Sequence, residues 1–254
     1  MFLHPGMPVT DSSRSYRRPH MTLAIAHRGD PIQFRENTLP AIRAGAAAGA
    51  DLVEIDLKLT ADGHVVLLHD DTLERFWGLA RPIGELTLAQ IAALGDGRDR
   101  RIPTLMEVLA EFGGPGRVPL MLDVASVDVA LAADDVVAEH GLLDRVVYSG
   151  AVEAMRAIRA RRPHARLTLT WDQQGLPPAE LWQVVQPRFY NSYWPLLTRE
   201  LVAEMHRHGY AVSAWTVNDV SEMARLIGMG VDAIITDQPA DLVKLVRGSP
   251  IPHR

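Results

Sequence analysis

The amino-acid sequence predicts an α/β protein, a single (β/α)8 barrel of the TIM type, from three observations. Short apolar runs rich in β-branched residues alternate with amphipathic segments of helical length, which is typical of a parallel sheet covered by helices. This alternation continues through most of the chain, which has 254 residues. A closed barrel of eight strands takes roughly 250 residues, so the length and the number of segments favour a barrel over an open sheet.

The candidate strands are short apolar runs that recur along the chain. They are Leu23–Ala26, Leu52–Leu57, Val65–Leu68, Leu120–Val124, Arg145–Tyr148, Arg166–Leu169, Arg188–Tyr190, Ala211–Trp215 and Ala233–Ile235. This is one more segment than a barrel of eight strands needs. We expect Arg188–Tyr190 to be weak or to lie outside the barrel.

Amphipathic segments of helical length lie between most of these strands. They are Leu39–Ala48, Leu88–Leu94, Leu105–Phe112, Val129–His140, Val152–Arg161, Arg199–His208 and Val220–Ile227. Gly49, Gly141 and Gly209 follow three of them, at the position where a left-handed glycine ends a helix. Thr104 and Asp219 are expected N-caps, because their side-chain oxygens can accept hydrogen bonds from the first helical turn.

One connection departs from the alternation. Between Leu57 and Val65 there is room only for a Thr-Ala-Asp-Gly turn. Parallel strands need a crossover of roughly a dozen residues or more. We therefore expect one irregular crossover between the second and third strands.

Composition excludes several classes of protein. The chain has no cysteine, which excludes disulfides, a thiolate nucleophile and Cys-ligated metals. The net charge of −5 argues against nucleic acid as a partner, and no apolar run approaches the roughly 18 residues of a transmembrane segment.

Residues 1–20 are proline-rich, lack a periodic apolar face and do not resemble a secretory signal. We expect them to be a flexible tail on a single domain over residues 21–254, with a cytoplasmic location.

Titratable residues gather at the ends of four predicted strands, where a barrel builds its active site. His27 ends the first strand, His69 follows the third and Asp123 ends the fourth. On the second strand, Glu54 and Asp56 are two residues apart and therefore face the same side. Two neighbouring carboxylates repel each other unless a cation lies between them, and oxygen ligands favour Mg²⁺ or Ca²⁺.

Each of these residues also has an ordinary structural interpretation. A single histidine at a strand end is more often structural than catalytic, Glu-x-Asp can lie on an edge or a solvated face, and aspartate also begins turns. The occurrence of such residues at four strand ends favours a functional site.

The order of the motifs resembles that of the glycerophosphodiester phosphodiesterase family from Leu23 to Leu245. The matching motifs are His27-Arg28-Gly29, Glu36-Asn37-Thr38, Gly49–Asp56, Leu59–Gly63, Leu68–Arg75, Arg101–Leu105, Trp215–Asn218 and Gly230–Pro239. The resemblance implies a barrel of the phospholipase-C-like phosphodiesterase type. It also implies metal-dependent hydrolysis of a small-molecule glycerophosphodiester to sn-glycerol 3-phosphate and an alcohol.

The same resemblance implies a role for each matching residue. His27 and His69 would be the catalytic acid/base pair, while Arg28, Glu36 and Trp215 would bind the substrate. A divalent cation, Mg²⁺ or Ca²⁺, would be held by oxygen ligands at Glu54, Asp56, Asp123 and Asn37. Two histidines suit proton transfer near neutral pH, whereas a glycosidase would use two carboxylates.

The chain departs from the family pattern on the fourth strand. Asp123-Val124-Ala125 stands where the family has Glu-x-Lys, so the third metal ligand is shorter and a cation near the phosphate is missing. Arg35, directly before Glu36, is either a compensating charge or a solvated loop residue. Two alternatives therefore remain open. One is an enzyme acting on lysophospholipids or another alcohol phosphodiester, and the other is a barrel that binds phosphodiesters without cleaving them.

Overall fold

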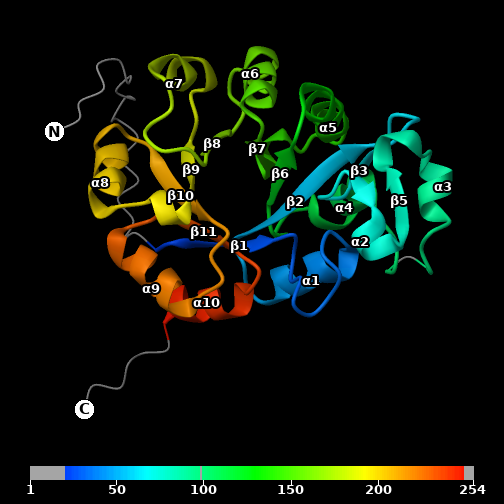
Figure 1. Ribbon diagram of the computed structural model, residues 1–254, viewed down its shortest axis with the longest axis horizontal. Coiled ribbons are helices and arrows are strands. Elements are labelled where there is room, and N and C mark those ends of the chain that lie inside the picture. The colour runs from blue at the N-terminus through cyan, green and yellow to red at the C-terminus, as the bar shows by residue number, and fades with distance from the viewer. Residues whose placement is uncertain (1–20, 98, 249–254) are drawn as a thin grey trace.

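Eight parallel strands form the barrel wall in the computed structural model, which describes residues 21–97 and 99–248 (Figure 1). The tail expected at residues 1–20 lies outside the described residues. The strands are β1 (Leu23–His27), β2 (Leu52–Leu59), β6 (Leu120–Val124), β7 (Val146–Gly150), β8 (Thr168–Trp171), β9 (Phe189–Tyr193), β10 (Ala211–Trp215) and β11 (Ala233–Thr236). Their order in the sheet is β7-β6-β2-β1-β11-β10-β9-β8. A parallel bridge between Tyr148 and Leu167 joins the two ends, so the predicted barrel is confirmed.

Helices cover the outside of this wall. They are α1 (Leu39–Ala47), α4 (Leu105–Phe112), α5 (Val127–Glu139), α6 (Val152–Arg161), α7 (Ala179–Val185), α8 (Arg199–Arg207), α9 (Val220–Met229) and α10 (Pro239–Arg247). Thr104 and Asp219 cap α4 and α9 as predicted, accepting hydrogen bonds from first-turn N–H groups. None of the described helices is long and apolar enough to cross a membrane.

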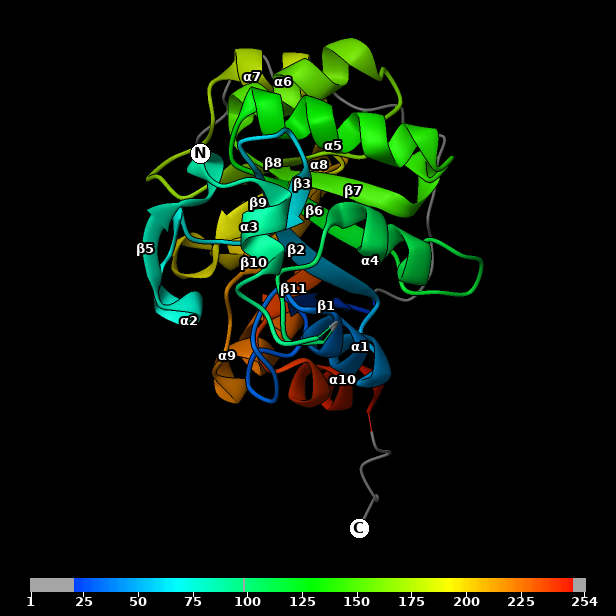
Figure 2. The ribbon, with the colours of Figure 1, turned by 90° about the vertical axis from the view of Figure 1, so that its right-hand side faces the viewer.

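The irregular connection after β2 is an insertion on one side of the barrel (Figure 2). It contains β3 (Val65–Leu67), β4 (Thr72–Leu73), α2 (Glu74–Trp77), β5 (Leu79–Pro82), a 3-10 turn (Ile83–Glu85) and α3 (Leu88–Ala92). β3 pairs antiparallel with the end of β2, because so short a turn can join only antiparallel strands. The extra strand is therefore Val65–Leu67. The expectation that Arg188–Tyr190 lies outside the barrel was wrong, since β9 pairs in parallel with β8 and β10.

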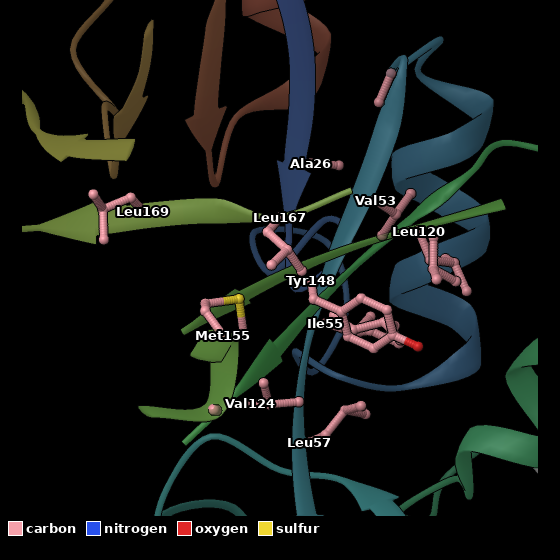
Figure 3. Close-up of a cluster of buried hydrophobic side chains, with 14 of the residues drawn as sticks. Ala26, Val53, Ile55, Leu57, Leu120, Val124, Tyr148, Met155, Leu167 and Leu169 are labelled. Carbon is pink, nitrogen blue, oxygen red and sulfur yellow. The ribbon is translucent and has the colours of Figure 1, made fainter. Parts of the chain in front are cut away.

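The alternation along β2 separates the core from the site. Val53, Ile55 and Leu57 are buried, at most 1% exposed, and belong to the apolar layer between sheet and helices (Figure 3). The side chains of Glu54 and Asp56 point the other way, into the barrel. The barrel interior is filled by a second apolar cluster with Ile25, Met121, Val147, Phe189, Ala233 and Ile235. Polar side chains occupy the interior near the carboxyl ends of the strands.

Candidate active site

A cavity of about 300 Å³ opens at the carboxyl ends of the strands. Eleven polar or charged side chains belong to its lining: His27, Arg28, Glu54, Asp56, Lys58, His69, Asp123, Ser149, Thr170, Asn191 and Thr216, with Trp215 on one wall. The structure thus brings together seven of the sequence-predicted site residues. Two others, Glu36 and Asn37, lie behind this lining.

Three carboxylates from adjacent strands face this cavity. Asp56 on β2 is in register with Asp123 on β6, and Glu54 precedes Asp56 by two residues. Burial, together with repulsion from Asp56, raises the pKa of Glu54 well above its usual range. The same two causes raise the pKa of Asp123 to about 6. The cluster therefore holds more negative charge than its surroundings neutralise, and it favours a bound cation.

Arg28 supplies the positive charge that contacts these carboxylates. Its backbone N–H donates to Glu54 Oε2 at 3.0 Å, and its Nε lies 2.9 Å from Asp56 Oδ2. Its Nη1 donates to Glu36 Oε1 at 2.9 Å. Glu36 also accepts hydrogen bonds from Arg75, so its carboxylate positions two arginines. The predicted contact between Glu36 and the substrate stays a prediction.

The loop that carries Arg28 is held in a strained backbone conformation. Arg28 and Asn37 have φ of 55° and 56°, in the left-handed region that non-glycine residues seldom adopt. A Cβ at Gly29 would lie 2.3 Å from the carbonyl carbon of Ala41 in α1. Glycine is thus required there for β1 and α1 to approach each other. Strain of this kind is concentrated at functional sites.

Asn37 orients Asp56. Its Nδ2 donates to Asp56 Oδ2 at 2.7 Å, and its Oδ1 accepts from the Asp56 backbone N–H at 3.1 Å. Both ends of the amide are therefore engaged by one residue, and Asn37 is only 3% exposed. This geometry gives Asn37 a positioning role toward Asp56, and its predicted role as a metal ligand stays a prediction.

His27 is the inner of two histidines at the site. Its Nδ1 lies 2.6 Å from Asp237 Oδ1, at the end of β11, and its Nε2 lies 3.9 Å from Glu54 Oε2. Asn218 donates to the other oxygen of Asp237 at 2.5 Å. Although burial opposes it, the hydrogen bond from His27 contributes to a lowered pKa of Asp237. An ionised Asp237 accepts a hydrogen bond from the Nδ1–H group, so that Nε2 is the nitrogen left to accept a proton.

His69 is the outer histidine and comes from the insertion. The reversal at β3 brings the chain back along β2, so that Leu68 N–H donates to the Asp56 carbonyl. His69 Nδ1 lies 2.7 Å from Asp70 Oδ1. The hydrogen bond from Arg75, followed by that from His69, lowers the pKa of Asp70. Each histidine therefore has an aspartate that orients its ring.

Several lining residues were missed in the sequence. Ser149, Thr170 and Asn191 lie on β7, β8 and β9 and form a row of polar side chains, with Asn191 Nδ2 donating to Thr170 Oγ1 at 3.2 Å. Lys58 continues the inward face of β2. The period of two along each strand contains this information, but only the barrel shows which face is inward. The hypothesis that Arg35 compensates for a missing charge gains no support. Its guanidinium lies 4.3 Å from the centre of the Trp77 ring and is absent from the cavity lining.

The carboxylates suit a divalent cation by their chemistry, although they are not arranged as a finished metal site. Within residues 21–97 and 99–248, no three His, Asp or Glu side chains form a metal-binding cluster. The buried, mutually repelling oxygen donors of Glu54, Asp56 and Asp123 nevertheless fit Mg²⁺ or Ca²⁺.

Comparisons with known proteins agree with this arrangement. Residues 27–241 match the model of the glycerophosphoryl diester phosphodiesterase family. A glycerophosphodiester phosphodiesterase of Caldanaerobacter subterraneus subsp. tengcongensis is 31% identical over 239 residues, covering 89% of this chain and 98% of that protein.

Two solved structures have the same fold. A phosphodiesterase of Oleispira antarctica, in complex with the product sn-glycerol-3-phosphate, has a TM-score of 0.76 and 26% identity. The match covers 90% of this chain and 98% of that one. A glycerophosphodiester phosphodiesterase of Thermotoga maritima has a TM-score of 0.75 and 25% identity over 90% of this chain and 100% of its own. Fold and sequence thus point to the same group of enzymes.

Proposed function

This chain belongs to the glycerophosphoryl diester phosphodiesterase family, and from that premise we propose how its site hydrolyses glycerophosphodiesters. The enzyme is a phosphoric diester hydrolase. The observation that carries the proposal is the combination, in one cavity, of three carboxylates with two histidines, each bound to its own aspartate. The products are sn-glycerol 3-phosphate and an alcohol.

Glu54, Asp56 and Asp123 are the proposed ligands of a divalent cation, Mg²⁺ or Ca²⁺. The raised pKa values of Glu54 and Asp123 support this assignment, because carboxylates forced together by the fold are stabilised by a shared positive charge. When bound, the cation supplies positive charge to the phosphate oxygens and acts as a Lewis acid. Asn37 holds the Asp56 carboxylate through its two hydrogen bonds.

His27 and His69 are the proposed proton-transfer residues. Hydrolysis removes a proton from the nucleophile and returns a proton to the oxygen of the leaving alcohol. The nucleophile is water, or it is the neighbouring glycerol hydroxyl, in which case water opens the resulting cyclic phosphate in a second step. One histidine performs each transfer. The hydrogen bonds to Asp237 and Asp70 fix the rings so that Nε2 is the reactive nitrogen of each.

Arg28 and Trp215 complete the proposed substrate site. Arg28 lowers the negative potential of the carboxylates, and Glu36 and Asp56 hold its guanidinium in place. The Trp215 ring lines the cavity, and its Nε1 donates to the Asn191 carbonyl at 3.4 Å. This gives the glycerol or the head group an apolar wall on that side.

Release of sn-glycerol 3-phosphate tests the proposal. Purified protein is incubated with a panel of glycerophosphodiesters and one lysophospholipid, with Mg²⁺, Ca²⁺, Mn²⁺ or excess chelator. We expect release that needs the metal and falls at least 100-fold in Glu54→Gln, since the electrostatic contribution is lost. His140→Ala, on the exposed end of α5, is the matched control and keeps full activity. Cleavage of the lysophospholipid alone would change the substrate class, and binding without release would favour a non-catalytic barrel.

Metal binding is measured separately from turnover. We expect Mg²⁺ or Ca²⁺ to raise the Tm of the wild type, because a ligand that binds only the folded state stabilises it. Asp123→Asn removes one negative donor and weakens this stabilisation. A Tm that rises equally in both proteins would contradict the assignment of Asp123 as a ligand.

A further inference from the structure

Lys58 is the third inward residue of β2, after Glu54 and Asp56. It lines the cavity, and its side chain is 15% exposed. The chain holds only one other lysine, Lys244. A lysine on this face brings a mobile positive charge to the rim of a cavity that must accept an anionic phosphodiester.

The two cations in the cavity lining differ in how firmly they are held. Arg28 is in contact with Asp56 and Glu36, at 2.9 Å from each, and both of these carboxylates are only 12% exposed. Withdrawing Arg28 would leave buried negative charge unpaired, which is costly. Lys58 Nζ instead lies 2.6 Å from Oδ1 of Asp71, whose side chain is 90% exposed. Water can solvate that carboxylate once the lysine leaves, so exchange of this partner costs little.

We propose that Lys58 is a further residue that binds the substrate phosphate. Its ammonium leaves Asp71 and donates hydrogen bonds to a non-bridging oxygen of the phosphodiester. Asp71 holds the side chain at the rim when no substrate is bound. The inference rests on the proposed function, because it assigns a ligand of the same site, and it gives that site a cation that the substrate can use.

The neighbouring strand β6 offers an internal test of this geometry. Leu57 on β2 is in register with Val124 on β6, so the next residues, Lys58 and Ala125, are neighbours on the same face. Ala125 also lines the cavity, and its methyl group carries no charge. A lysine placed at position 125 would therefore reach the same cavity from the adjacent strand.

The experiment compares four proteins with the wild type: Lys58→Met, Lys58→Arg, Lys58→Met combined with Ala125→Lys, and the surface control Lys244→Met. Steady-state kinetics gives kcat and KM, and calorimetric titration gives the affinity for sn-glycerol 3-phosphate. We expect Lys58→Met to raise KM and weaken product binding by about tenfold or more, as for loss of a hydrogen bond to a charged group. Lys58→Arg stays within about threefold, and the double variant recovers most of the loss. Lys244→Met matches the wild type.

Two results would overturn the inference. One is a Lys58→Met variant, folded by circular dichroism and Tm, whose KM and product affinity stay within twofold of the wild type. The other is a loss confined to kcat, with product affinity intact. Failure of the proposed function itself is distinct, because the wild type would then release no sn-glycerol 3-phosphate. Asp71→Asn adds a test of opposite sign. Removal of the competing carboxylate is expected to lower KM. A tenfold rise in KM would contradict the proposal that Lys58 exchanges Asp71 for the substrate phosphate.

Discussion

The two histidines of the site show how one chemical unit is built by two kinds of structure. His27 and Asp237 end neighbouring strands of the barrel and lie 210 positions apart in the chain, and their side chains are 16% and 26% exposed. His69 and Asp70 are adjacent residues of the insertion, and their side chains are 47% and 27% exposed. The inner pair exists only when the barrel closes, whereas the outer pair is assembled locally.

The two pairs also differ in the residues that bind their aspartates. Asp237 is held by the neutral side chain of Asn218, whereas Asp70 is held by the charged side chain of Arg75, which also binds Glu36. The inner pair lies where water is largely excluded, so its hydrogen bonds are electrostatically stronger. The outer pair is accessible to water, which can replace part of its function. We therefore expect every change to have a larger effect on the inner pair.

Removal of each histidine is the largest expected effect. His27→Ala should lower kcat about 1000-fold and His69→Ala about 100-fold, within the range for general acid–base groups. Steady-state rates at saturating substrate and metal measure both, with His140→Ala as the control. Equal losses, or a larger loss for His69, would contradict the difference between inner and outer pairs.

Removal of the orienting carboxylates comes next. Asp237→Asn should lower kcat roughly 100-fold, because the amide no longer favours the Nδ1–H form of His27. Asp70→Asn should cost about tenfold, since solvent can orient the exposed His69 ring in part. The two variants are compared with Asp172→Asn, a carboxylate outside the described cavity lining. A kcat for Asp237→Asn near that of the wild type would show that the inner pair does not need its carboxylate.

Glu36→Gln tests the carboxylate that binds both Arg28, near the inner histidine, and Arg75, near the outer one. The change weakens the ion pairs that Glu36 makes with two arginines. Arg28 keeps its contact with Asp56, and Arg75 keeps its contact with Asp70. KM should rise by about threefold to tenfold with kcat little changed, which is the result for a positioning group near the rim. Kinetics over a substrate series tests this, and a loss of kcat above 100-fold would instead indicate direct participation in catalysis.

Stability in acid is the smallest expected effect. The folded-state pKa values of Asp237 and Asp70 are lowered, so each carboxylate stabilises the fold above its unfolded pKa of about 3.9. That contribution is lost as the pH falls through the lowered folded value. Urea unfolding of wild type and Asp237→Asn between pH 7 and pH 3 should therefore show a difference in unfolding free energy that shrinks with acidity. A difference independent of pH would contradict the linkage, and Asp70→Asn should show a pH dependence of the same sign, because the pKa of Asp70 is lowered as well.

Local periodicity was enough to predict the part of the site that lies on β2. Glu54 and Asp56 are separated by one apolar residue, so they had to share a face, and the apolar neighbours Val53, Ile55 and Leu57 had to occupy the core. His27 and Asp123 were expected at strand ends, and the structure places both in the cavity lining. Pairing partners were not predictable in this way. The interpretation of Arg188–Tyr190 was wrong because a short apolar run carries no sign of which strand it joins.

The sequence by itself determined the barrel, its irregular connection after β2 and the carboxylate and histidine residues that characterise the family, because these depend on local pattern and motif order. The tertiary structure decided which residues meet. It brought Asp237 to His27, placed Asn37 against Asp56, turned Glu36 toward two arginines and set Lys58 at the cavity rim. His27 and Asp237 lie 210 positions apart and meet only because β1 pairs with β11. Glu36 and Asn37 lie 8 and 19 positions from Arg28 and Asp56, and the loop between β1 and α1 brings them into contact when it packs against β2.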